Sequence, residues 1–98
     1  MFYIYMIYSQ SSDIYYIGYS SDPKKRLDQH NSNEGGKFTG KRSNWILKAV
    51  FEESDSRAET MKLEKFIKKQ KSRVFIEKLI DPNFILTGQL AQLCLILD

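Results

Sequence analysis

The sequence MFYIYMIYSQSSDIYYIGYS, residues 1–20, decides the fold. It contains two runs rich in Tyr and Ile, residues 2–8 and 14–19, which a polar segment of Gln, Ser and Asp separates. Aromatic and β-branched residues favour strands, and short polar segments favour turns. The stretch therefore predicts a β-hairpin.

The six tyrosines of the chain all lie within this hairpin, at Tyr3, Tyr5, Tyr8, Tyr15, Tyr16 and Tyr19. With a loop at residues 10–13, Tyr5 pairs with Gly18, and Tyr16 lies on the same face of the hairpin as Tyr5. Because Gly18 has no side chain, we expect a gap over the Tyr5 ring where another group can approach the sheet. Tyrosines at alternate strand positions are usually structural, but this tyrosine-rich face is also a candidate site.

A short helix is predicted directly after the hairpin. Asp22 is a good N-cap residue, and Pro23 fits the first helical position because its missing N–H needs no partner there. Arg26 and His30 are one helical turn apart and therefore share a face of this helix. Each residue alone also has an ordinary interpretation. Arg26 can be a charge exposed to solvent, and His30 can interact with the helix dipole.

The rest of the chain predicts one more strand and two more helices. Residues 45–53 are apolar and β-branched enough for a strand, and Ser56 with Glu59 forms a capping box that begins a helix ending near Lys71. Residues 73–80 form a further helix before the Asp-Pro pair. The chain is therefore predicted to be an α+β domain, with a small three-stranded antiparallel sheet flanked by helices in the order β-β-α-β-α-α.

Length and composition restrict the function classes. A chain of 98 residues has room for one modest core. Cys94 is the single cysteine and His30 the single histidine, so an internal disulfide and a Cys/His zinc site are excluded. No apolar run is long enough to span a membrane, and we expect a protein of the reducing cytoplasm.

Basic residues are clustered, although the formal net charge is only +3. Clustered positive charges favour binding to a polyanion such as nucleic acid more strongly than the net charge of the whole chain indicates. The lysines and arginines expected to contact nucleic acid are Lys24, Lys25, Lys37, Lys41 and Arg42. The apolar tail, residues 81–98, is expected to pack on the same domain, or else to dock a partner, so the chain is a monomer or a weak homodimer through this tail.

Glu64 is the carboxylate with the least ordinary position. Its helical neighbours Met61 and Ile67 are apolar, which places it at the rim of the buried stripe. An ion pair with Lys68, one turn later, would be an ordinary explanation. A lone carboxylate near a core, in a chain that also presents tyrosines, an arginine and a histidine, suggests instead the metal-assisted hydrolysis of a phosphodiester.

These residues together resemble the GIY-YIG nuclease superfamily. The resemblance rests on YIY at residues 3–5, YIG at residues 16–18, Arg26 eight residues after the glycine, His30 one turn later, and Glu64 in a downstream helix. The chain is most similar to small standalone members, which resemble the nuclease domain of the bacterial nucleotide-excision repair endonuclease. The resemblance covers about residues 1–80, and it departs from the signature at Tyr3, where the family has glycine.

The resemblance implies a catalytic set of Tyr5, Tyr16, Arg26, His30 and Glu64. It implies a DNA endonuclease that uses Mg²⁺ or Mn²⁺ held by Glu64, with RNA not excluded as a substrate and with a role in DNA repair. Tyr5 would act as the general base, and Arg26 with nearby lysines would ease loss of its proton. The alternative is a non-catalytic nucleic-acid-binding module on the same fold.

Overall fold

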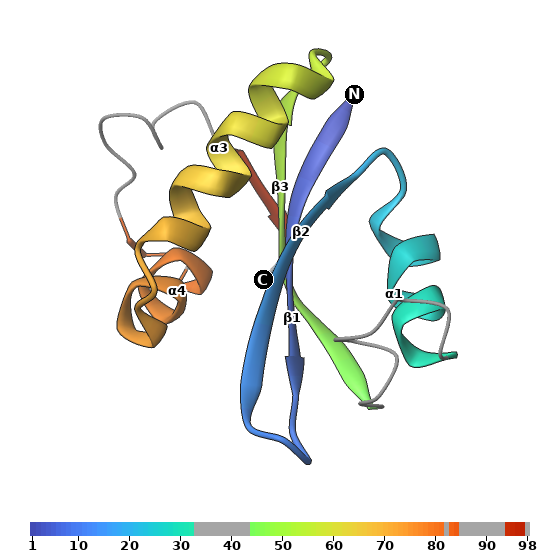
Figure 1. The fold of residues 1–98 in the computed structure, drawn as a ribbon, viewed down its shortest axis with the longest axis vertical. Helices are drawn as coiled ribbons and strands as arrows, with labels where there is room; N and C mark the ends of the chain where they lie inside the picture. The colour runs from blue at the N-terminus through green and yellow to red at the C-terminus, as the bar shows by residue number, and fades with distance from the viewer. Residues whose placement is uncertain (33–43, 82, 85–93, 98) are drawn as a thin grey trace.

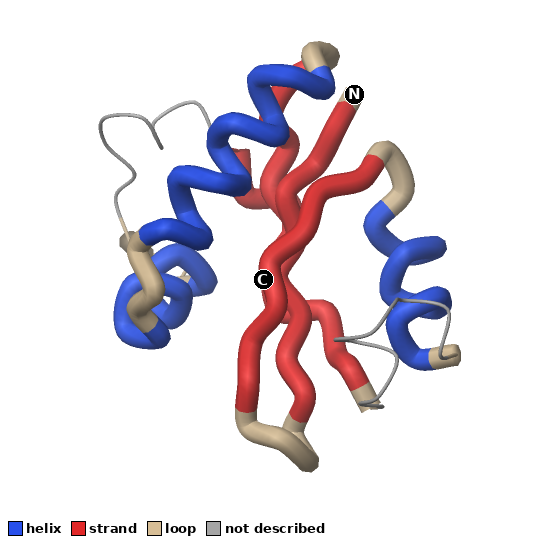
Figure 2. The backbone as a smooth tube through the Cα atoms, viewed as in Figure 1, coloured by secondary structure: helices blue, strands red, loops and turns tan. Residues whose placement is uncertain are grey.

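The computed structural model describes residues 1–32, 44–81, 83–84 and 94–97. Lys37, Lys41 and Arg42, which we expected to contact nucleic acid, lie outside the described residues. The elements, drawn by type in Figure 2, are β1 (Phe2–Ser9), β2 (Ile14–Ser20), α1 (Pro23–Asn31), β3 (Trp45–Ser54), α3 (Arg57–Lys69), α4 (Arg73–Ile80) and β4 (Cys94–Leu97).

The predicted α+β order is confirmed for the first six of these elements. The strands form an antiparallel sheet in the spatial order β2-β1-β3-β4, so β1 is central and β2 lies at an edge. The fourth strand, β4, comes from the apolar tail and pairs with β3. Its four residues are apolar throughout, so the period-two alternation that identifies a strand is missing from the sequence.

The hairpin has the predicted register. Ser9 pairs with Ile14, and Tyr5 pairs with Gly18. The backbone N–H of Asp13 closes the loop by donating to the Ser9 carbonyl at 2.7 Å. This register places the side chains of odd-numbered β1 residues on one face of the sheet and those of even-numbered residues on the other.

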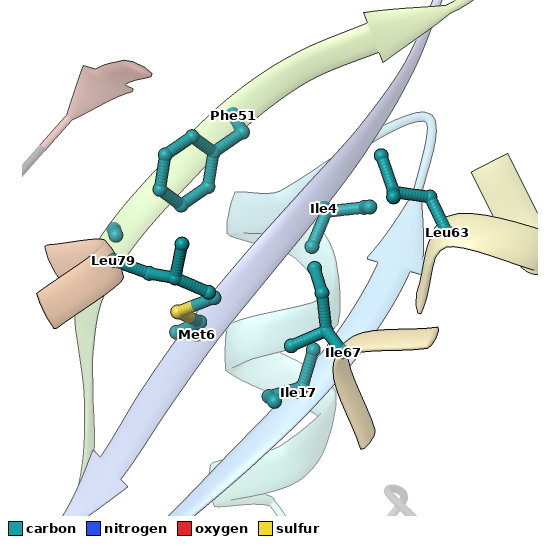
Figure 3. Packing of buried hydrophobic residues seen from close by; sticks show 8 residues of the cluster. Ile4, Met6, Ile17, Phe51, Leu63, Ile67 and Leu79 are labelled. Carbon is teal, nitrogen blue, oxygen red and sulfur yellow. The ribbon is translucent and has the colours of Figure 1, made fainter. Parts of the chain in front are cut away.

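Helices cover both faces of the sheet, with α1 on one side and α3 and α4 on the other (Figure 1). The core on the α3 and α4 side is shown in Figure 3 and contains Ile4, Met6, Ile17, Ala49, Phe51, Leu63, Ile67 and Leu79. The core on the α1 side contains Tyr5, Ile7, Trp45 and Val50. Both faces of the hairpin are therefore buried, as its apolar and aromatic sequence predicts.

Helices α1 and α3 begin at the predicted caps. The Asp22 carboxylate accepts from the Lys25 N–H at 3.2 Å, and the Ser56 hydroxyl accepts from the Glu59 N–H at 3.3 Å. The reciprocal half of the capping box is replaced, because the Glu59 carboxylate accepts from the Ser54 hydroxyl instead. Within the described residues, no helix has the length and apolar character needed to cross a membrane.

Tyr5 and Gly18 approach each other closely across the pair of strands β1 and β2. A Cβ atom added at Gly18 would lie 2.5 Å from Cζ of Tyr5 and closer still to its hydroxyl oxygen. The Tyr5 ring itself fills the gap that we expected another group to enter. Gly18 is therefore required by the position of the phenol and not by an unusual backbone conformation.

We expect Gly18→Ala to lower the free energy of unfolding by about 1–3 kcal/mol, because the new methyl group overpacks the Tyr5 ring. In a Tyr5→Leu background the same substitution should cost less than about 0.5 kcal/mol, because Leu lacks the outer ring atoms. Urea unfolding of the four proteins measures this difference. Equal losses in both backgrounds would show that the contact does not restrict this position.

Candidate active site

A cavity of about 410 Å³ opens beside the edge strand β2. Residues of both α1 and α3 line it, although these helices lie on opposite faces of the sheet (Figure 1). Four of the five predicted catalytic residues line it, namely Tyr5, Tyr16, Arg26 and Glu64. The other lining residues are Phe2, Gly18, Tyr19, Ser20 and Arg57.

The fifth predicted residue, His30, lies behind the cavity wall. Its side chain is fully buried, and its Nε2 atom is 2.9 Å from the Tyr5 hydroxyl oxygen. The ring centroids of His30 and Tyr16 are 5.3 Å apart. His30 therefore contacts both tyrosines of the predicted set without lining the cavity itself.

Burial sets the protonation state of this pair. It lowers the pKa of His30 to about 4, and the positive charge of Arg26 acts in the same direction. The imidazole is therefore neutral near pH 7, and the tautomer with its proton on Nδ1 lets Nε2 accept from the Tyr5 hydroxyl.

The Tyr5 phenol is harder to ionise than a free tyrosine. Burial raises its pKa, and Arg26 opposes this effect without overcoming it. Arg26 therefore acts in the expected direction and eases proton loss from Tyr5, but burial of the ring has the larger effect and the pKa stays raised. Any proton that this hydroxyl takes up must be matched by one that it gives away.

Glu64 is nearly buried, with 7% of the residue exposed, and lies at the apolar rim as predicted. Its carboxylate forms an ion pair with Lys68 at 2.9 Å, so the ordinary interpretation of this residue is also correct. The Lys68 ammonium lies 5.0 Å from the ring centroid of Tyr16. Lys68 therefore connects the carboxylate to the tyrosine-rich face.

The donor set suits a hydrated hard cation and not zinc. Among the described residues, no group of three His, Cys, Asp or Glu side chains comes together to hold a metal ion. Mg²⁺ is commonly bound through one or two carboxylates, while water and substrate phosphates complete its coordination. Glu64 beside an open cavity fits this mode of binding for Mg²⁺ or Mn²⁺.

Arg57 is a cavity residue that the sequence analysis missed. Its Nε atom donates to the Tyr19 hydroxyl at 3.3 Å, while Arg26 on α1 donates to the Gln29 side chain at 2.6 Å. Two guanidinium groups, from α3 and α1, therefore line the same cavity. Arg57 lies seven residues before Glu64, and this spacing places both on one face of a helix. This spacing is the feature of the sequence that could have identified Arg57 as a site residue.

The two lysines of α1 that we expected to contact nucleic acid do not line this cavity. Lys24 and Lys25 are exposed, and neither lines it. Lys24 contributes instead to a separate cavity with Tyr3 and Val50. Contact between these lysines and nucleic acid stays a prediction.

Comparison with known proteins gives the family. Residues 1–78 match the model of the GIY-YIG catalytic domain. The chain belongs to the GIY-YIG family. A UPF0213 protein from Halobacterium salinarum is 38% identical over 68 residues, which span 69% of this chain and 86% of the relative.

A UPF0213 protein from Streptococcus pyogenes serotype M5 is 41% identical over 58 residues, or 59% of this chain, and the match spans only 62% of that relative. No solved structure matches. The GIY-YIG resemblance seen in the sequence is therefore confirmed, and the general function that the family supports is that of a nuclease.

We expect His30 to make stability depend on pH below neutrality. Between pH 6.5 and about 4 the unfolded chain binds a proton at His30 that the folded protein does not, so the free energy of unfolding falls as pH falls through this window. The loss from pH 7.5 to pH 5 should be about 2 kcal/mol.

Urea unfolding at the two pH values tests this, with His30→Gln as the comparison. The variant should show a correspondingly smaller difference between pH 7.5 and pH 5, whatever its absolute stability. Asp13, whose pKa is lowered to about 2 by Arg73 and Tyr8, changes its contribution only at lower pH. The same pH dependence in wild type and His30→Gln would rule out the buried imidazole as its source.

Proposed function

We propose that this protein is a divalent-metal-dependent endonuclease that hydrolyses DNA phosphodiester bonds. The observation that carries the proposal is the cavity itself, in which three phenols, two guanidinium groups and a nearly buried carboxylate come together. These are the groups needed to deprotonate a water molecule, to hold a cation and to neutralise charge on phosphorus. The family membership of the chain supports the same reaction class.

The substrate phosphate is held by Arg26 and Arg57, and Glu64 would hold the divalent cation. When bound, Mg²⁺ or Mn²⁺ supplies Lewis-acid charge to the reacting phosphate. Arg26 stabilises the charge that develops on the phosphate oxygens, and Tyr16 positions the phosphate or the attacking water. Glu64 would hold the cation with the carboxylate that pairs with Lys68 in this structure.

Tyr5 and His30 provide a path for the proton of the attacking water. As the Tyr5 oxygen takes this proton, the Tyr5 hydroxyl passes its own to Nε2 of His30, so no phenolate forms in the buried site. A bound phosphate offsets the charge of Arg26, which is one cause of the low pKa of His30. Substrate binding thereby makes His30 a better base.

We expect Glu64→Gln to lose at least about 100-fold in cleavage rate, because the amide keeps the side-chain shape but removes the charge that binds the cation. The measurement is cleavage of labelled single-stranded, duplex and branched DNA, and of RNA, with Mg²⁺, Mn²⁺ or a chelator. Binding, followed by fluorescence anisotropy in chelator, should persist.

Glu59→Gln is the matched control, since Glu59 is an exposed carboxylate on the same helix and does not line the cavity. It should cleave at the wild-type rate. If wild type bound nucleic acid but cleaved no member of the panel with either metal, the alternative of a non-catalytic binding module would replace the proposal.

We expect Tyr5→Phe to lose about 10²–10⁴-fold in turnover, because the proton path through the hydroxyl is removed. It should also lower the free energy of unfolding by about 1–3 kcal/mol, because buried His30 loses the phenol as a hydrogen-bond partner. Tyr8→Phe removes an exposed hydrogen bond to Asp13 and should keep its activity. Rates are compared below the unfolding range of each variant, and equal rates for the two would exclude the proton path.

A further inference from the structure

A second cavity adjoins the proposed active site. It has a volume of about 420 Å³ and lies between β2 and the corner where α3 meets α4. Tyr16 lines both cavities. Lys68 lines the second cavity and is bound to Glu64 of the first. The two cavities are therefore neighbours, and the proposed hydrolysis uses only one of them.

The second cavity has the surface that a flat aromatic ligand requires. Its lining is mostly apolar and includes Ile17, Ile67 and Ile76. Tyr15 also lines it, and the Tyr15 ring lies 4.8 Å from the Tyr8 ring and 5.4 Å from the Arg73 guanidinium. Tyrosine rings and guanidinium planes are the surfaces on which proteins stack unpaired nucleobases.

Three cations line the same cavity, Lys68, Lys71 and Arg73. Two of them already have carboxylate partners. Arg73 is bound to Asp13 at 2.8 Å and to Glu77 at 3.6 Å.

Lys68 is bound to Glu64, whereas Lys71 forms no ion pair within the described part of the chain. Lys71 is exposed and carries the positive charge that a ligand can use. A cavity with an apolar interior and this cation at its rim complements a base attached to a phosphate.

The backbone at Lys71 favours a role for its side chain. Lys71 has a φ angle of 48°, in the left-handed region that glycine adopts without strain and lysine does not. The turn between α3 and α4 thus has a strained residue that lines the cavity. Glycine at this position would relieve the strain and remove the charge.

We propose that this cavity binds the base of an unpaired nucleotide next to the phosphate under attack, with Lys71 contacting the phosphate of that nucleotide. The inference rests on the proposed nuclease function and names its substrate class. A base inside a duplex is stacked and paired, so it must leave the double helix of the nucleic acid to enter the cavity. The preferred substrate is therefore a strand that is single at the cleavage position, as in a flap, a frayed end or a single strand.

The first test is binding in chelator, measured by anisotropy, of one labelled strand alone and as a blunt duplex. Wild type should bind the single strand at least about fivefold more tightly, which is the lower range of the contribution of one stacked base. Lys71→Glu should lose this preference.

Lys69→Glu changes the charge equally two residues away, and Lys69 lines neither of the two cavities, so it should keep the preference. Lys71→Gly should also lose affinity for the single strand, with a thermal midpoint no lower than that of wild type. This second variant separates loss of the charge from loss of the fold.

The second test removes single bases. Once the cleavage position is mapped, abasic nucleotides are placed one at a time along the strand. A loss of wild-type cleavage confined to a nucleotide that flanks the cut supports the cavity as a base site.

The outcomes separate the two proposals. If wild type binds no nucleic acid, the proposed function fails, and this inference fails with it. If wild type cleaves but binds single strand and duplex equally, with Lys71→Glu indistinguishable from Lys69→Glu, only the inference is overturned. Uniform tolerance of abasic nucleotides would overturn it as well.

Discussion

The proposed site depends on one steric constraint, the passage of the Tyr5 ring over Gly18. Tyr5 comes from the central strand, and its ring must cross the edge strand to reach the cavity. Any side chain opposite it on β2 would occupy the space of the ring. The absence of one side chain thus lets a residue of the sheet interior present its hydroxyl at the molecular edge, where residues from α1 and α3 also meet.

The same placement fixes the electrostatics of the site. Burial that holds the Tyr5 ring in place also raises its pKa, and burial of His30 keeps the imidazole neutral. A phenol in this position is a poor base alone but a good proton carrier between water and an imidazole. Packing and proposed chemistry are therefore set by one arrangement of side chains.

Local features were predictable from the sequence, because a few neighbouring residues determine them. The hairpin register followed from alternation and loop length, and the caps at Asp22 and Ser56 followed from their own side chains. Four of the five predicted site residues line one cavity, and from the sequence only the family resemblance brought them together. Arg57 was missed, since its position depends on how α3 crosses the sheet, and the hydrogen bond from Tyr5 to His30 depends on the packing of α1.

The residues of the site come from both early and late segments of the chain. The hairpin and α1 supply the phenols, the imidazole and one guanidinium within the first third of the chain, but the carboxylate arrives only with α3. A chain in which α3 has not yet docked lacks both this carboxylate and the Arg57 guanidinium. Under the proposed mechanism, hydrolysis therefore begins only when α3 has docked on the sheet and has brought the carboxylate to the tyrosines.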